Sequence, residues 1–150
     1  NFIEYSWFDR GSDERQYCAP GIDLPIASIL RTKYGSYPEY HTSLDNLENV
    51  VTPKGLDGGY WAIRKAIEAI EKNKKYKVSV LCEPQMGKRK LYSTLDPNIR
   101  DEKVWLMMNF ISLCDGENSL LEIAERLNVP IWSLYDIINK LLIHGLIEVN

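Results

Sequence analysis

The sequence predicts an α/β domain followed by a C-terminal winged-helix-like module. Two apolar segments of strand length lie in the first third of the chain, and amphipathic segments with a 3.6-residue period follow them. From residue 104 onward the pattern is almost wholly helical, with a short apolar segment at the end. We therefore place a boundary near residue 95, with the α/β domain over 1–95 and the winged-helix-like module over 97–150.

Three strands are predicted in the α/β domain. Bulky side chains alternate over 2–8, and a polar turn follows them over 9–15. The segment 25–31 is apolar up to its final arginine, which is typical of a strand buried on both faces of a helix-covered sheet. The third strand is predicted over 77–82.

Two helices complete the predicted domain. The first begins at Thr42, which forms a pair resembling a capping box with Asp45, and Ser43 is the alternative cap. The second runs over about 56–75, and the lysines near its end suit the negative pole of the helix dipole.

The C-terminal module is predicted from a helix, a helix–turn–helix pair and a strand. The first helix is expected over 104–113, the second begins after Ser119 as its N-cap, and the third is expected over 131–143. The strand is expected over 146–149. This order of elements is that of a winged helix.

The length and composition of the chain indicate about one globular domain, and its cysteine content indicates a reducing compartment. The chain has 150 residues, 45% of them hydrophobic and 26% charged, and no apolar run long enough to span a membrane. Its cysteines, Cys18, Cys82 and Cys114, are odd in number and form no C-x-x-C pair, so we expect reduced thiols in a cytoplasmic protein. A catalytic thiol at Cys18 is the alternative.

The charge distribution argues against nucleic acid as a partner. Residues 101–150 carry three basic and eight acidic side chains, and the last predicted helix offers only Lys140 against Asp136. DNA binding requires cations on the recognition helix and its flanks. We therefore expect the module to contact protein, either within the chain or in a homo-oligomer.

His41 is the most informative single residue. It follows a predicted buried strand and a Gly/Pro-containing loop, and such loops are where α/β domains build their sites. By position alone it is either a metal ligand or a capping, hydrogen-bonded histidine.

Several motifs together resemble a known family. The sequence has Asp-Glu-Arg-Gln-Tyr-Cys over 13–18, Tyr-His-Thr over 40–42 and Cys-Glu-Pro-Gln-Met-Gly-Lys-Arg over 82–89. In this order they resemble the C-terminal part of the co-catalytic zinc aminopeptidases, the superfamily that also contains glutamate carboxypeptidase. More narrowly, they resemble a bacterial branch of aminopeptidase-like proteins labelled as polysaccharide-biosynthesis proteins.

The resemblance implies a three-layer sandwich with a mixed sheet, two zinc ions and hydrolysis of an amide bond in a small peptide or amide. It implies that His41 is the last zinc ligand and that Tyr40 stabilises the oxyanion. Arg31 falls where relatives bind a substrate carboxylate, although a structural ion pair is the alternative. Asp13 and Glu14 fall in a pocket-forming turn, where the resemblance implies substrate binding, with Glu14 where many relatives have histidine.

The other metal ligands and the general base lie upstream in that family. We therefore expect this chain to be the C-terminal piece of a longer enzyme, with the missing upstream part of the same domain as its partner. Alone, it is expected to bind no zinc tightly and to be inactive. The alternatives are a non-catalytic relative that keeps the scaffold, and a winged-helix protein-interaction module.

Overall fold

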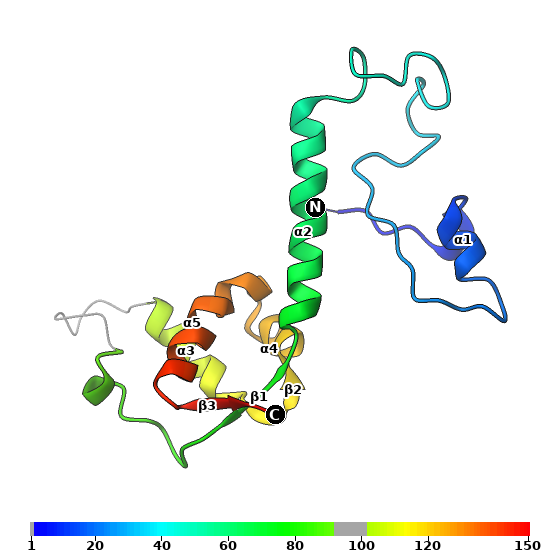
Figure 1. Cartoon of the computed structure of the whole chain (residues 1–150). Helices are drawn as coiled ribbons and strands as arrows, with labels where there is room; N and C mark the ends of the chain where they lie inside the picture. Colours follow the sequence, from blue (N-terminus) through cyan, green and yellow to red (C-terminus); the bar gives the residue numbers. More distant parts are fainter. Residues whose placement is uncertain (1, 92–101) are drawn as a thin grey trace. The chain divides into compact units, whose positions relative to one another are not determined.

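The computed structural model describes residues 2–91 and 102–150. The chain divides into two compact units, Asn1–Arg64 and Lys65–Asn150. The first unit contains the short 3-10 helix η1 (Trp7–Asp9), the helix α1 (Asp13–Tyr17) and the beginning of α2 (Pro53–Lys72) (Figure 1). Turns and extended segments make up the rest of this unit.

The second unit is a small helical body built around a three-stranded antiparallel sheet. Its elements in chain order are β1 (Lys75–Val78), η2 (Gly87–Arg89), α3 (Glu102–Ser112), β2 (Asp115–Ser119), α4 (Leu120–Leu127), η3 (Ile131–Leu134), α5 (Tyr135–Ile143) and β3 (Ile147–Val149). The strand order is β2-β1-β3, so β1 is central. Its pairing with β3 sets Tyr76 opposite Val149 and Val78 opposite Ile147. Mixed helices and sheet thus form a partial α/β fold with a winged-helix module, as predicted.

The hydrophobic core lies entirely in the second unit. Every buried hydrophobic side chain among the described residues falls between Tyr76 and Ile147. Phe110, Leu120 and Leu134 are fully buried, because the amphipathic helices α3 and α4 and the turn η3 direct their apolar sides inward.

The start of α4 confirms the predicted cap. The Ser119 hydroxyl accepts a hydrogen bond from the backbone N–H of Glu122, and the Glu122 carboxylate accepts one from the N–H of Ser119 at 2.7 Å. This reciprocal pair satisfies two N–H groups that the first turn of a helix leaves without partners.

The strands predicted over 2–8 and 25–31 do not form. A strand needs a neighbour to accept and donate its backbone hydrogen bonds, and no strand is assigned in the described part of the first unit. The helix expected from Thr42 is also wrong. The Thr42 hydroxyl donates a hydrogen bond to the Glu39 carbonyl at 2.7 Å and accepts one from the Leu44 N–H. This local pattern favours a turn over a helix.

The long helix α2 instead begins at Pro53. Proline suits the first position of a helix because a backbone N–H there has no acceptor within the helix, so the lack of one in proline costs nothing. The preceding residue, Thr52, accepts a hydrogen bond from the Gly55 N–H at 3.0 Å and acts as the cap.

The structure groups one predicted strand differently. The sequence pattern places a strand over 77–82 in the first domain, whereas the strand runs over Lys75–Val78 and is the central strand of the second unit's sheet. The boundary predicted near residue 95 lies outside the described residues and stays a prediction. Across 2–91 and 102–150, no helix has the length and apolar character needed to cross a membrane.

Candidate functional site

In the first unit His41 stacks on Tyr40, and two further tyrosines lie against Tyr40. The Tyr40 and His41 rings stack with centroids 4.0 Å apart and an interplanar angle of 17°. Tyr37 meets Tyr40 edge-on at 5.7 Å, and Tyr34 lies 6.1 Å from Tyr40. His41 has φ +60°, a left-handed conformation uncommon outside glycine, and its side chain is exposed. The turn therefore presents the imidazole at the surface, beside the ring of its neighbour.

Glu14 is joined to this cluster through Tyr34. Glu14 is 5% exposed, and the Tyr34 hydroxyl donates a hydrogen bond to its Oε1 at 3.3 Å. The pKa of Glu14 is lowered, first by a backbone N–H hydrogen bond and then by the hydroxyls of Ser28 and Tyr34, against the opposing effect of desolvation. Glu14 is thus held as a carboxylate, whereas Asp13 is exposed at the start of α1.

Arg31 lines a cavity of about 490 Å³ together with Tyr37, Glu39 and Asp45. The Tyr37 hydroxyl donates to Asp45 Oδ2 at 3.0 Å, and desolvation followed by this carboxylate raises the pKa of Tyr37. Within the described residues Arg31 forms no ion pair, so the structural pairing that we considered is not present there. Its guanidinium remains available to an anionic group in the cavity.

Gly58 on α2 makes room for this arginine. A Cβ added at Gly58 would lie against the tip of the Arg31 guanidinium, and that flexible side chain would have to shift. Sequence reasoning did not identify Gly58, nor Tyr34, because the contacts that matter join segments twenty or more residues apart. No local pattern marks such pairs.

The predicted site residues divide into three groups. Tyr40 and His41 share one stack, and Arg31 lies in the cavity that Tyr37 also lines. Glu14 lines a separate cavity of about 310 Å³ with Tyr34, and Asp13 does not line it. Tyr34 and Tyr37 therefore connect groups that lie apart in the sequence.

The described residues by themselves do not fit a zinc site. Nowhere in 2–91 or 102–150 do three His, Cys, Asp or Glu side chains come together in a way that could hold a metal. His41 supplies one imidazole, whereas a catalytic zinc takes about three protein ligands. The second histidine, His144, caps the end of α5 in the other unit.

All three cysteines are free thiols. Cys18 donates to the carbonyls of Leu24 and Ile26 at 3.1 and 3.2 Å, a turn-stabilising role that argues against a catalytic thiol. Burial raises the pKa of the Cys114 thiol to about 12, so this residue stays neutral in the core.

Two known protein families match the chain, one over each part. Residues 74–149 match the winged helix-turn-helix family, and the chain belongs to this family. Residues 1–73 match a family described as a domain of unknown function (DUF4910). The two matches meet where β1 begins.

A longer relative and a solved structure, both from Clostridium acetobutylicum, resemble the chain. One, named "Putative polysaccharide biosynthesis protein with aminopeptidase-like domain", is 41% identical over 124 residues, covering 80% of this chain and 28% of the relative. The other is a crystal structure of a "putative peptidase", with 33% identity and a TM-score of 0.79 over 95% of this chain. This chain covers 31% of that protein, so it spans less than a third of either relative. The chain is thus homologous to aminopeptidase-like proteins.

Proposed function

We propose that this chain is the His41-bearing part of a zinc-dependent aminopeptidase-like hydrolase that cleaves an amide bond in a small peptide or amide. The observation that supports this most is the exposed His41 imidazole stacked on Tyr40, in a chain whose homologues are named as aminopeptidase-like and peptidase proteins. The remaining zinc ligands and the general base would come from the part of the longer protein that this chain does not span.

In this proposal the His41 imidazole would supply one ligand of a two-zinc site. The stack with Tyr40 restricts rotation of the ring and orients its nitrogens. Zinc, when bound, lowers the pKa of a water and polarises the scissile carbonyl. The Tyr40 hydroxyl donates a hydrogen bond to the carbonyl oxygen as that oxygen gains negative charge.

Arg31 would bind the substrate end that carries a carboxylate. Its guanidinium can donate two parallel hydrogen bonds to such a group, and the cavity it lines has room for a small side chain. Glu14 and Asp13 would shape the neighbouring turn, with Glu14 acting through Tyr34. The three free cysteines fit a reducing compartment, and we propose a cytoplasmic location.

An activity assay on the longest protein that the native gene produces tests this function. A panel of aminoacyl amides and dipeptides is supplied with zinc, and His41→Ala and Tyr40→Phe are compared with the wild type. We expect measurable hydrolysis, its loss in His41→Ala, and a fall of about 10²-fold or more in kcat for Tyr40→Phe. No hydrolysis of any substrate by a zinc-loaded wild type would instead support the non-catalytic relative.

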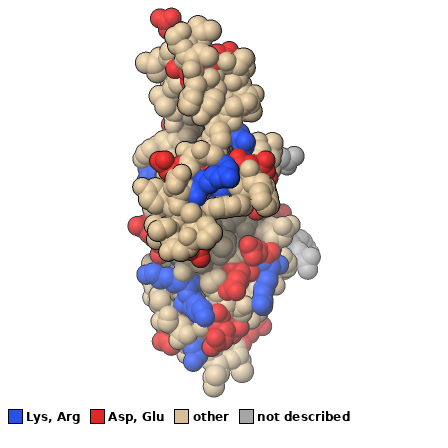
Figure 2. Space-filling view, turned by 90° about the vertical axis from the view of Figure 1, so that its right-hand side faces the viewer, with Lys and Arg blue, Asp and Glu red and all other residues tan. Residues whose placement is uncertain are grey.

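A protein-interaction role of the winged-helix unit is the second candidate. This unit has its own core, and the outward positions of α5 include Asp136, Lys140 and the 81% exposed Ile143. Figure 2 shows basic and acidic side chains interspersed over the face drawn, not gathered by sign. Both observations favour a protein surface over the phosphate backbone of DNA.

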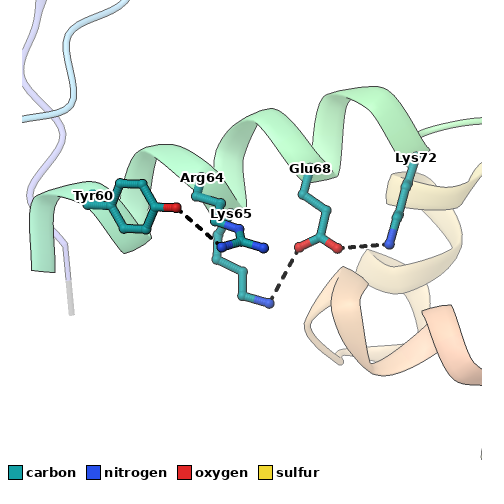
Figure 3. Close-up of polar contacts among 5 residues, drawn as sticks. All are labelled: Tyr60, Arg64, Lys65, Glu68 and Lys72. Atoms are coloured by element: carbon teal, nitrogen blue, oxygen red, sulfur yellow. Dashed lines mark hydrogen bonds and ion pairs between the residues drawn. The ribbon is translucent and has the colours of Figure 1, made fainter. Parts of the chain in front are cut away.

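The charge of the winged-helix unit is balanced over the bounds that the structure gives it. The unit that the structure defines, Lys65–Asn150, includes the lysines before and after β1 and carries twelve basic and twelve acidic side chains. Lys65 and Lys72 each contact an aromatic ring and pair with Glu68 (Figure 3), and their side chains stay 42% and 47% exposed. We propose that the unit does not bind nucleic acid, and a salt-sensitive mobility shift with duplex DNA would contradict this.

A further inference from the structure

The cavity beside Glu14 contains a buried carboxylate without an ion-pair partner. This cavity of about 310 Å³ is lined only by residues between 2 and 34, so it forms within the first unit. Glu14 lines it and is 5% exposed, and the Tyr34 hydroxyl donates a hydrogen bond to Glu14 Oε1 at 3.3 Å. Within the described residues no ammonium or guanidinium forms an ion pair with Glu14. A carboxylate buried to this extent usually has such a partner.

Hydrogen bonds, rather than a neighbouring cation, keep Glu14 ionised. The pKa of Glu14 is lowered first by a backbone N–H and then by the hydroxyls of Ser28 and Tyr34, whereas the charge of Arg10 has the smallest effect. These hydrogen bonds offset part of the cost of burying the carboxylate. They leave a negative charge beside the cavity that a cation can neutralise.

Aromatic rings on the wall of the same cavity attract a cation. Lys33 Nζ lies 5.3 Å from the ring centre of Tyr5 and 5.0 Å from that of Tyr34, and all three residues line the cavity. The face of an aromatic ring attracts an ammonium group at such distances. The Lys33 ammonium is therefore an internal example of a cation drawn to these rings.

We infer that this cavity binds the basic side chain of a substrate, an ammonium or guanidinium on a flexible alkyl chain, through the Glu14 carboxylate and the rings of Tyr5 and Tyr34. Ile3 and Leu30 also line the cavity and would contact the alkyl part of that side chain. The inference rests on the proposed function only in calling the bound molecule a substrate, because none of these residues is a proposed zinc ligand.

The cavity lies next to the candidate site. The ring of Tyr34, which lines the cavity, is 6.1 Å from the ring of Tyr40, and Tyr40 stacks on His41. A basic side chain in the cavity would thus belong to a molecule whose neighbouring atoms reach the Tyr40–His41 stack. This proximity favours a substrate over a ligand bound far from the chemistry.

An anionic ligand is a poorer occupant. Arg10 and Lys33 are the two cations among the lining residues, and each lies over an aromatic ring, 5.1 and 5.0 Å from its centre. Three carboxylates also line the cavity, those of Glu4, Asp9 and Glu14. The carboxylates outnumber the cations, and an anion would lie beside the buried charge of Glu14, which repels it.

Saturation-transfer difference NMR on the longest product of the native gene tests this inference. The probe is n-butylammonium, which has the end of a lysine side chain, and n-butanol is its neutral control. A chelator is present throughout, so the amine cannot bind zinc and a failure of the proposed metal chemistry leaves the result unchanged. We expect n-butylammonium to bind at least about tenfold more tightly than n-butanol. Equal binding of the two, or no binding of the ammonium, would overturn the inference.

A matched pair of variants locates the binding. Glu14→Gln removes the charge and keeps an oxygen that accepts the Tyr34 hydrogen bond. Glu48→Gln makes the same change at an exposed glutamate of the first unit that does not line the cavity. We expect the affinity for n-butylammonium to fall about tenfold in Glu14→Gln and to stay unchanged in Glu48→Gln. Full affinity in Glu14→Gln would contradict the inference.

Two further variants keep the test decisive if Glu14→Gln does not fold. Tyr5 is 43% exposed, so Tyr5→Leu leaves the fold intact and should weaken the binding severalfold by removing one ring. Lys33→Gln should instead strengthen it, because the resident ammonium no longer competes for the rings. Structural damage would weaken binding in both variants, so the opposite signs identify the cation site. A loss of affinity in Lys33→Gln, or none in Tyr5→Leu, would overturn the assignment.

Discussion

The hydroxyl of Tyr34 donates a hydrogen bond to the buried carboxylate of Glu14, with 3.3 Å between the two oxygens. The same hydroxyl accepts a hydrogen bond from the Gly11 N–H at 2.6 Å, and the ring lies 6.1 Å from that of Tyr40. Tyr34 therefore links the turn at α1 to the turn that presents His41, two motifs that lie more than twenty residues apart.

Removing this hydroxyl is expected to raise the pKa of Glu14. In the wild type the pKa is depressed, so the carboxylate's contacts contribute at neutral pH and are lost as the pH falls through that depressed value. Tyr34→Phe removes one of the lowering hydrogen bonds and keeps the ring. An NMR titration of Glu14 measures the change, and an unaltered pKa in Tyr34→Phe would show that the hydroxyl does not hold the carboxylate.

Two adjacent leucines on α4 test where the core lies. Leu120 is fully buried and Leu121 is 44% exposed. Leu120→Ala is expected to lower the free energy of unfolding of the second unit by about 2–5 kcal/mol, because it leaves a cavity. Leu121→Ala should cost less than about 1 kcal/mol. Denaturant titration measures both, and equal losses would place the core elsewhere.

The cap of α4 predicts a pH-dependent contribution. Ser119→Ala should destabilise the second unit by about 1 kcal/mol at neutral pH. The pKa of Glu122 is lowered, first by the Ser119 backbone N–H, so its part of the cap is present at neutral pH and is lost as the pH falls through that lowered value. Lowering the pH should therefore reduce the stability of Glu122→Gln less than that of the wild type. Unfolding curves of both proteins at neutral and acid pH measure the difference.

The central position of β1 predicts which piece of the chain folds alone. A piece over 97–150 lacks the strand that joins β2 to β3, so it should not give a cooperative thermal transition. A piece over 65–150 contains the whole core and should give one. Circular dichroism during heating distinguishes them, and a cooperative transition in 97–150 would mean that β1 is dispensable.

The sequence predicted the helical module well because its signals are local. The Ser119 cap and the 3.6-residue apolar periods are each complete within a few residues. The segments 2–8 and 25–31 were misjudged because a strand depends on a neighbour, which no local pattern supplies. The strand β2 was missed because Asp115 and Gly116 have the composition of a turn.

The candidate site was predictable only in part. The Tyr-His-Thr motif pointed to His41 and Tyr40, and the structure adds their stack. The roles of Tyr34 and Gly58 depend on contacts with residues far along the chain, so they emerged only from the fold.

The decisive measurement is the zinc content of the longest product of the native gene, with His41→Ala and His144→Ala alongside. These are the two histidines of the chain, and His144 caps a helix in the other unit, so it is a matched control. We predict about two zinc ions per wild-type molecule, an unchanged number in His144→Ala and a clear loss in His41→Ala. Zinc retained in full by His41→Ala, or absent from the wild type, would contradict the assignment of His41 as a metal ligand.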